Sequence, residues 1–323
     1  MARYLDFVYL DVFTTTPFQG NPLAIIHLPS PTSTHPALTQ AQKQAIAREL
    51  NLSETVFIHE LSPNRKGDRN SNQRKIDIFM PTLELPFAGH PTVGTAVYLQ
   101  DRNVDTLVTK AGPIAIHHAS PGHVGVSIPH NTHLHQKTTS FIPSEIQELQ
   151  LHPNLAVRRA ELIAPIFSIV DGMNFGLIQL QNLEELSLVF PGASGFSTAN
   201  NLLDDGWKNT YMARYYYVVL SSSSASSETR YVALRTRMME KNFEDPATGA
   251  AAAALSSYYA LYKCDETELQ VSITQGVEFG RQSDISVYVA LSVGEDGKRM
   301  IKEVRLGGTA TQTLKGSVMV PPV

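Results

Sequence analysis

The sequence predicts an α+β protein of two domains with related structure, each a mixed β-sheet or barrel wrapped around one central buried α-helix. The chain of 323 residues is long enough for two cores of ordinary size. Residues 91–100 and 246–262 are apolar or small on all sides, as in a helix that is buried all round. These stretches also open alike, with HPTVGTA at 90–96 and DPATGAA at 245–251, which indicates a duplicated unit.

The N-terminal half reads as strands followed by a buried helix. Residues 4–13 alternate and are rich in aromatic and β-branched types, which predicts a strand that ends in turn signals up to Pro22. A helix is expected at 39–49. Strands at 55–58 and 75–80 then flank a polar hairpin tip at 62–73, and Pro91 is expected at the first position of the buried helix.

The C-terminal half repeats this organisation. We expect an N-terminal domain of residues 1–135 and a C-terminal domain of residues 136–309, with a last strand at about 310–323 that returns to the first domain. Pro246 is expected to open the second buried helix. The serine-rich stretch 221–227 is expected to be a flexible loop. Strands are predicted on both sides of that helix, at 215–220, 229–237, 270–276, 284–292 and 302–306.

Composition excludes several function classes. The 26 Lys and Arg residues face 30 Asp and Glu residues without a basic run, which argues against a nucleic-acid partner. We find neither an apolar stretch of membrane-spanning length nor a signal peptide, so we expect a cytoplasmic protein. The single cysteine, Cys264, excludes an internal disulfide and a racemase with two facing thiols.

The usual cofactor motifs are also missing. The sequence contains no G-x-S-x-G, Walker or G-x-G-x-x-G motif. The eleven histidines, including His133 and His135, show no spacing that is typical of metal ligands. We therefore expect neither a metal nor a cofactor.

Glu54, His90 and Asp245 are the candidate catalytic residues. Glu54 stands where a half-buried strand begins, and burial raises the pKa of a carboxyl toward the range of a useful proton donor and acceptor. A helix cap or an ion pair is the structural alternative for it. His90 and Asp245 occupy matching positions in the two helix openings, although a hydrogen-bonded core histidine and a helix cap would explain them equally.

Gly89, Gly249 and Ala250 are the candidate substrate-binding residues. The start of a helix carries backbone N–H groups without partners and a partial positive charge, and glycine lets a ligand approach the backbone closely. Two such starts that converge would hold a carboxylate. A small carboxylate-bearing molecule is therefore the expected ligand.

Several motifs in order carry a resemblance to a known family. They are LDVFTTTPFQGNPLAI, LSETVF, ELPFAGHPTVGTA and FEDPATGAAA, with weaker matches in QGVEFGRQSDISV. With them the chain resembles the PhzF-like phenazine biosynthesis proteins of the diaminopimelate epimerase superfamily, from about residue 7 to about residue 318. The resemblance implies two pseudo-symmetric domains, and a homodimer that acts without a cofactor.

The resemblance also implies a reaction. Glu54 would be the acid/base, with His90, Asp245, Gly89 and the Gly249–Ala250 backbone at the substrate. In the phenazine enzyme a carboxylate shuttles a proton between ring carbons and so isomerises trans-2,3-dihydro-3-hydroxyanthranilate.

Two departures from the family pattern leave the substrate open. Ala250 replaces the serine of ATGSA, and Arg237 leads into Asp245 through a stretch unlike the family's R-x-F-x-P-x-x-G-I. An epimerase or racemase, with His90 or Asp245 as a second base facing Glu54, is the alternative enzyme. A non-catalytic ligand-binding or interaction protein that retains the fold is the alternative of another class.

Overall fold

The computed structural model describes residues 2–32, 36–61, 72–142, 144, 150–191, 199–208, 211–240 and 243–322. The chain divides into two compact units, one of Met1–Ser127 with Gly307–Val323 and the other of Ile128–Leu306. The second boundary falls inside the long strand β17 (Arg299–Met319). The boundaries predicted from the sequence were after residues 135 and 309.

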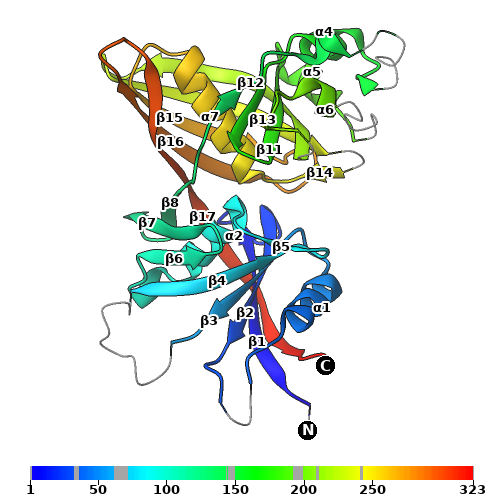
Figure 1. Ribbon diagram of the computed structural model, residues 1–323, viewed down its shortest axis with the longest axis vertical. Helices are drawn as coiled ribbons and strands as arrows, with labels where there is room; N and C mark the ends of the chain where they lie inside the picture. Colours follow the sequence, from blue (N-terminus) through cyan, green and yellow to red (C-terminus); the bar gives the residue numbers. More distant parts are fainter. Residues whose placement is uncertain are drawn as a thin grey trace. The chain divides into compact units, whose positions relative to one another are not determined.

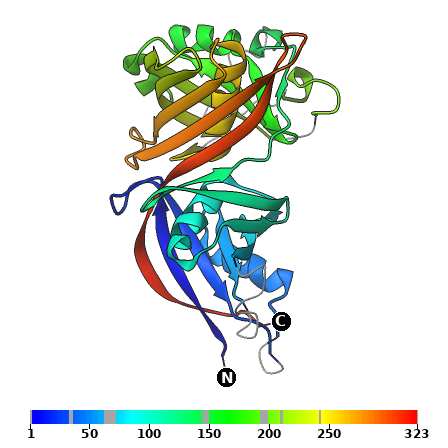
Figure 2. The same ribbon diagram turned by 90° about the vertical axis from the view of Figure 1, so that its left-hand side faces the viewer.

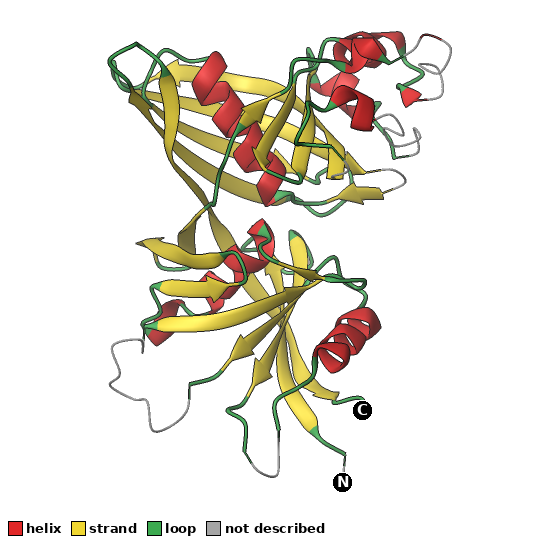
Figure 3. Cartoon of the chain, viewed as in Figure 1, coloured by secondary structure: helices red, strands yellow, loops and turns green. Residues whose placement is uncertain are grey.

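In the first unit, strands surround the short helix α2 (Gly89–Tyr98), and α1 (Gln40–Leu50) covers the other face of the sheet (Figures 1 and 3). Strand β17 runs antiparallel to β1 and pairs Met319 with Tyr4, so both chain ends lie at one end of this unit (Figure 2). The remaining strands are β1 (Tyr4–Val12), β2 (Asn21–Leu28), β3 (Thr55–His59), β4 (Gln73–Phe79), β5 (Glu84–Leu85), β6 (Thr106–Thr109), β7 (Gly112–Ser120) and β8 (His123–Ser127).

In the second unit, the strands surround the longer helix α7 (Gly249–Tyr262), which crosses the inside of the sheet (Figure 3). Among the described residues, the short helices α4 (Leu155–Leu162), α5 (Leu183–Ser187) and α6 (Ala199–Leu202) lie in the connections. The strands are β9 (His133–Leu134), β10 (Ile166–Val170), β11 (Met173–Gln179), β12 (Tyr211–Ser224), β13 (Thr229–Glu240), β14 (Phe243–Asp245), β15 (Glu268–Gln275) and β16 (Ser283–Val293).

The two units repeat one order of strand pairing. In the first, β1–β2 is antiparallel, β2–β3 parallel and β3–β4 antiparallel; β4 then pairs with β5 antiparallel and with β6 parallel. In the second, β10–β11, β11–β12 and β12–β13 follow the same three steps, and β13 pairs with β14 antiparallel and with β15 parallel. The helices α2 and α7 occupy the same place in this order, after β5 and β14. The duplication therefore extends far beyond the seven-residue match in the sequence.

Small residues let the two central helices lie close to their strands. A Cβ atom added at Gly94 of α2 would come within 2.6 Å of Val12 Cγ2 and 2.8 Å of Leu23 Cδ2. In α7 the run from Ala251 to Ala254 is fully buried. A helix without an exposed face cannot be stabilised by amphipathic packing on one side only, so the surrounding strands must close around it.

Two details of the predicted elements are wrong. Neither Pro91 nor Pro246 opens its helix, because α2 begins at Gly89, before Pro91, and α7 begins at Gly249, after Pro246. The serine-rich stretch is not simply a loop, because β12 continues to Ser224 in register with β13. Backbone pairing in a long hairpin needs no apolar side chain, and composition therefore understates the strand. Most of the expected hairpin tip, residues 62–71, lies outside the described residues.

One buried carboxylate ties α1 to the sheet. Asp77 of β4 accepts hydrogen bonds from Lys43 Nζ at 2.6 Å and from His59 Nε2 at 2.7 Å. Burial of this carboxyl by itself raises its pKa, but the bonds from His59 and Lys43 outweigh burial and lower the pKa to about 2. No helix among the described residues is long and apolar enough to cross a membrane.

Candidate active site

Glu54 and His90 meet in the first unit. Glu54 immediately precedes β3, and His90 is the second residue of α2. His90 Nδ1 lies 3.5 Å from Glu54 Oε2, and the two side chains are 6% and 17% exposed. A carboxylate and an imidazole, both largely withdrawn from water, are thus in direct reach of each other, which is the arrangement needed to hold and move a proton.

The start of α2 adds a positive potential to this pair. Its N-cap residue, Ala88, has an extended backbone and no side chain that can cap the helix. The first backbone N–H groups, at Gly89 and His90, therefore lack a side-chain cap, and they carry the partial positive charge of the helix start. A negative oxygen, whether from a side chain or a ligand, is stabilised at such a place.

The second unit builds a similar helix start beside Asp245. Asp245 ends β14, and its Oδ2 accepts the Thr248 hydroxyl at 2.6 Å while Oδ1 accepts the Ala247 N–H at 3.4 Å. Thr248 is the N-cap of α7, but its side chain does not cap the helix. Gly249 and the half-buried Ala250 are the first two residues of α7 and present their backbone as Gly89 and His90 do in α2.

Gln275 holds the Asp245 turn in place, a role that sequence reasoning missed. Its Nε2 donates to Asp245 O at 2.8 Å, and its Oε1 accepts from the Thr248 N–H at 3.3 Å and from Tyr215 Oη at 3.0 Å. Burial raises the pKa of Tyr215 well above its usual value, and the nearby charge of Asp245 raises it further, so the phenol stays a donor. The QGVEFG motif was the only sequence signal for Gln275.

A buried ion pair supports the strand that carries Asp245. The guanidinium of Arg237 donates to both oxygens of Glu244, at 2.8 and 2.6 Å, and also to Val189 O at 2.5 Å. Such a two-point contact fixes the β13–β14 hairpin in one geometry. The family pattern begins with this arginine, although the residues that follow differ from it.

The six predicted site residues therefore form two groups. Glu54, Gly89 and His90 lie together in the first unit, and Asp245, Gly249 and Ala250 lie together in the second. A cavity of about 1140 Å³ in the first unit has His27, Glu60, Tyr98, Arg102 and Lys315 in its wall. Neither Glu54 nor His90 lines that cavity, which is at the end of α2 opposite to His90.

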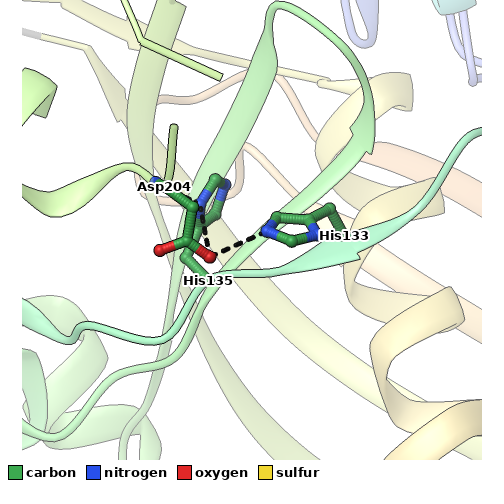
Figure 4. A group of neighbouring side chains, drawn as sticks. All are labelled: His133, His135 and Asp204. Atoms are coloured by element: carbon green, nitrogen blue, oxygen red, sulfur yellow. Dashed lines mark hydrogen bonds and ion pairs between the residues drawn. The ribbon is translucent and has the colours of Figure 1, made fainter. Parts of the chain in front are cut away.

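A buried thiol and a group of histidines remain outside these two groups of site residues. Burial raises the pKa of Cys264 to about 11, so its thiol stays protonated and is a poor nucleophile. His133, His135 and Asp204, by contrast, converge in the second unit (Figure 4). Sequence spacing could not reveal this group, because Asp204 is distant along the chain.

Comparison with known proteins agrees with the fold and with the motifs. The family model of the phenazine biosynthesis-like proteins matches residues 10–316. An uncharacterized isomerase of Mesorhizobium japonicum is 29% identical over 98% of this chain and 99% of its own length. A trans-2,3-dihydro-3-hydroxyanthranilate isomerase of Pseudomonas fluorescens is 27% identical over the same shares.

Solved structures agree as well. The chain resembles the crystal structure of a PhzF-family protein of Bacillus anthracis, with a TM-score of 0.69 and 20% identity over 98% of this chain and 99% of that one. The predicted fold class is thereby confirmed. The resemblance drawn from the motifs is confirmed too: the chain belongs to the family of phenazine biosynthesis-like (PhzF) proteins.

Proposed function

We propose that this protein is a PhzF-like isomerase that moves a proton on a small carboxylate-bearing substrate, with Glu54 as its acid/base. The observation that carries the proposal is the contact of 3.5 Å between Glu54 Oε2 and His90 Nδ1 at the start of α2. The isomerases among the relatives support the class of reaction. The substrate is an amino-acid-like or hydroxy-acid-like molecule, open-chain or cyclic.

The proposed chemistry is a proton shuttle without change of oxidation state. The Glu54 carboxylate takes a proton from a substrate carbon, and the electron pair of the broken C–H bond forms a new double bond while an existing, conjugated double bond of the substrate opens toward a different carbon. The protonated Glu54 then returns the proton to that carbon, which the electron pair of the opened double bond binds. His90 positions the Glu54 carboxylate and can adjust its hydrogen bond when the charge of that carboxylate changes. The partial positive charge at the start of α2 favours the ionised form of Glu54 between turnovers.

Asp245, Gly249 and Ala250 are proposed to bind the substrate. The support is local: the α7 start lacks a side-chain cap, as the α2 start does, and Asp245 is held rigidly by Thr248 and Gln275. Backbone N–H groups at Gly249 and Ala250 suit a carboxylate, and Asp245 suits an amino or hydroxyl group. His90→Ala and Asp245→Ala should each weaken ligand binding and turnover together.

An epimerase would need a second base opposite Glu54. In the duplicated order of elements, β12 corresponds to β3, and the pairing of Thr55 with Phe79 corresponds to that of Arg214 with Met239. The residue that matches Glu54 is therefore Ala213, which is not a carboxylate. This difference favours a shuttle by one base. The proposal also includes a cytoplasmic homodimer, as the family resemblance implies, which light scattering of the purified protein tests.

Solvent deuterium exchange tests the proposed reaction. The enzyme is incubated in D₂O with trans-2,3-dihydro-3-hydroxyanthranilate and with a panel of small cyclic and acyclic amino and hydroxy acids, and products are analysed by mass spectrometry and chiral chromatography. A single shuttling base gives a product that retains part of the substrate proton and keeps its configuration. Complete exchange with inversion would instead identify a two-base epimerase and refute the shuttle.

A further inference from the structure

His133, His135 and Asp204 form a compact group in the second unit, and none of them is among the residues assigned to proton transfer. His133 belongs to β9, His135 follows it, and Asp204 comes shortly after α6. One ligand atom from each side chain lies within 4.8 Å of the other two, and Figure 4 shows the three side chains turned toward one another. His133 Nε2 is 2.9 Å from Asp204 Oδ2, and His135 Nδ1 is 3.9 Å from the same oxygen.

Hydrogen bonds determine which nitrogen of His135 faces the group. The Asp204 backbone N–H donates to His135 Nδ1 at 3.1 Å, so this nitrogen carries a lone pair and the proton is on Nε2. Nε2 donates to Ser168 Oγ at 2.9 Å, Ser168 donates to Asn174 Oδ1, and Asn174 Nδ2 donates to Tyr211 O at 2.7 Å. Imidazoles that bind metal are typically oriented by such an outer hydrogen bond from their second nitrogen.

We propose that His133 Nε2, His135 Nδ1 and a carboxylate oxygen of Asp204 bind a divalent transition-metal ion of the Zn²⁺ type. Two imidazole nitrogens and one carboxylate oxygen are ligands that Zn²⁺ accepts at about 2.0 to 2.2 Å. In a tetrahedral site such bonds keep the ligand atoms about 3.4 Å apart, which lies between the two separations of 2.9 and 3.9 Å to Asp204 Oδ2. When the ion binds, His133 Nε2 loses its proton to solvent, and the ion takes the place of the Asp204 backbone N–H at the lone pair of His135 Nδ1.

The exposure of the group suits an ion that enters from solvent. The His135 side chain is fully buried, whereas those of His133 and Asp204 are 33% and 17% exposed. Water can therefore supply the remaining ligand on the side of His133. The ion would join the end of β9 to the segment after α6, so its role is to stabilise the second unit rather than to take part in proton transfer.

Trp207 supplies a direct reporter for binding. It is the only tryptophan in the sequence, and its ring stacks on His133 with centroids 4.8 Å apart and planes 9° apart. Ions such as Co²⁺ and Ni²⁺ quench indole fluorescence at close range. Because no other indole contributes, any saturable quenching reports this location.

The test uses untagged full-length protein that has been treated with a chelator. Tryptophan fluorescence is titrated with Co²⁺, and Zn²⁺ is titrated by calorimetry. We expect saturable quenching, one Zn²⁺ per chain, recovery of fluorescence when Zn²⁺ displaces Co²⁺, and no binding of Mg²⁺. A 100-fold excess of Zn²⁺ over its Kd should raise the Tm by about 5 to 10 °C, if binding is to the folded state alone.

Variants separate a metal site from a purely hydrogen-bonded group. Asp204→Asn keeps the shape and the Trp207 stack but removes the charged ligand, and His133→Ala removes an exposed ligand. Each should weaken Zn²⁺ binding by more than about tenfold, since even outer-shell changes cost 10- to 100-fold. His130→Ala, a histidine of the same segment outside the group, should bind as the wild type does. Equal affinity in all four proteins, or no binding by the wild type, would overturn the proposal.

Discussion

Glu54→Gln is the substitution that tests the proposed acid/base most directly. The amide has the size of the carboxylate but cannot carry the proton, and general acid/base catalysis contributes about 10²- to 10⁴-fold to rate. We therefore expect kcat to fall by that factor, which corresponds to about 3 to 5 kcal/mol of transition-state stabilisation. Ligand affinity should change little, because the proposed contacts to the substrate carboxylate come from other residues.

We expect that this loss does not come from unfolding. The Glu54 side chain is 17% exposed and its contact with His90 is 3.5 Å, longer than a strong hydrogen bond. The amide keeps the packing, so we expect stability to change by no more than about 1 kcal/mol, or about 4 °C in Tm. Thermal melts and ligand-binding measurements check both expectations.

A matched control distinguishes the effect of changing Glu54 from the effect of any Glu-to-Gln substitution. Glu49→Gln makes the same chemical change at an exposed position of α1, outside the proposed site. Turnover is measured on a substrate identified by deuterium exchange. Near wild-type kcat in a well-folded Glu54→Gln variant would remove Glu54 from the mechanism, and an equal loss in Glu49→Gln would show that the effect is not specific.

The remaining predictions concern stability. The folded pKa of Asp77, about 2, is below its ordinary value of 3.8, so its contribution is present above pH 4 and is lost as the pH falls toward 2. In urea unfolding, the advantage of wild type over Asp77→Asn should shrink by about 2 kcal/mol between pH 5 and pH 2; a constant difference would contradict this. Gly94→Ala should lower the Tm, because overpacking costs about 1 to 3 kcal/mol and alanine regains only about 1 kcal/mol in a helix. A Tm at or above wild type would refute that close packing. Ala250→Ser should leave the Tm within about 2 °C, since serine is well tolerated at a helix start, and calorimetry then shows whether the added hydroxyl improves substrate binding; a marked loss of stability would show that the site has no room for it.

Local pattern was enough to predict the fold class and much of the first group of site residues. The two central helices were predictable because residues 91–100 and 246–262 lack a polar face, and an apolar helix must be surrounded. Glu54 was recognisable as a carboxylate at the beginning of a strand, although this strand, β3, is buried on both faces and not on one as the alternation predicted. The motifs then identified the family, and the comparisons bear this out.

Contacts between residues distant in sequence depended on tertiary structure alone. The packing of separate segments brings Gln275 to Asp245 and Asp204 to His135, and no periodicity records such neighbours because each contact is made by a different pair of segments. The helix start at Gly249 rather than Pro246 was likewise decided by β14, which pairs with β13 up to Asp245. Composition and spacing thus determined which elements this protein forms, whereas packing between those elements decided which polar side chains meet, since that depends on the positions of whole strands and helices in space.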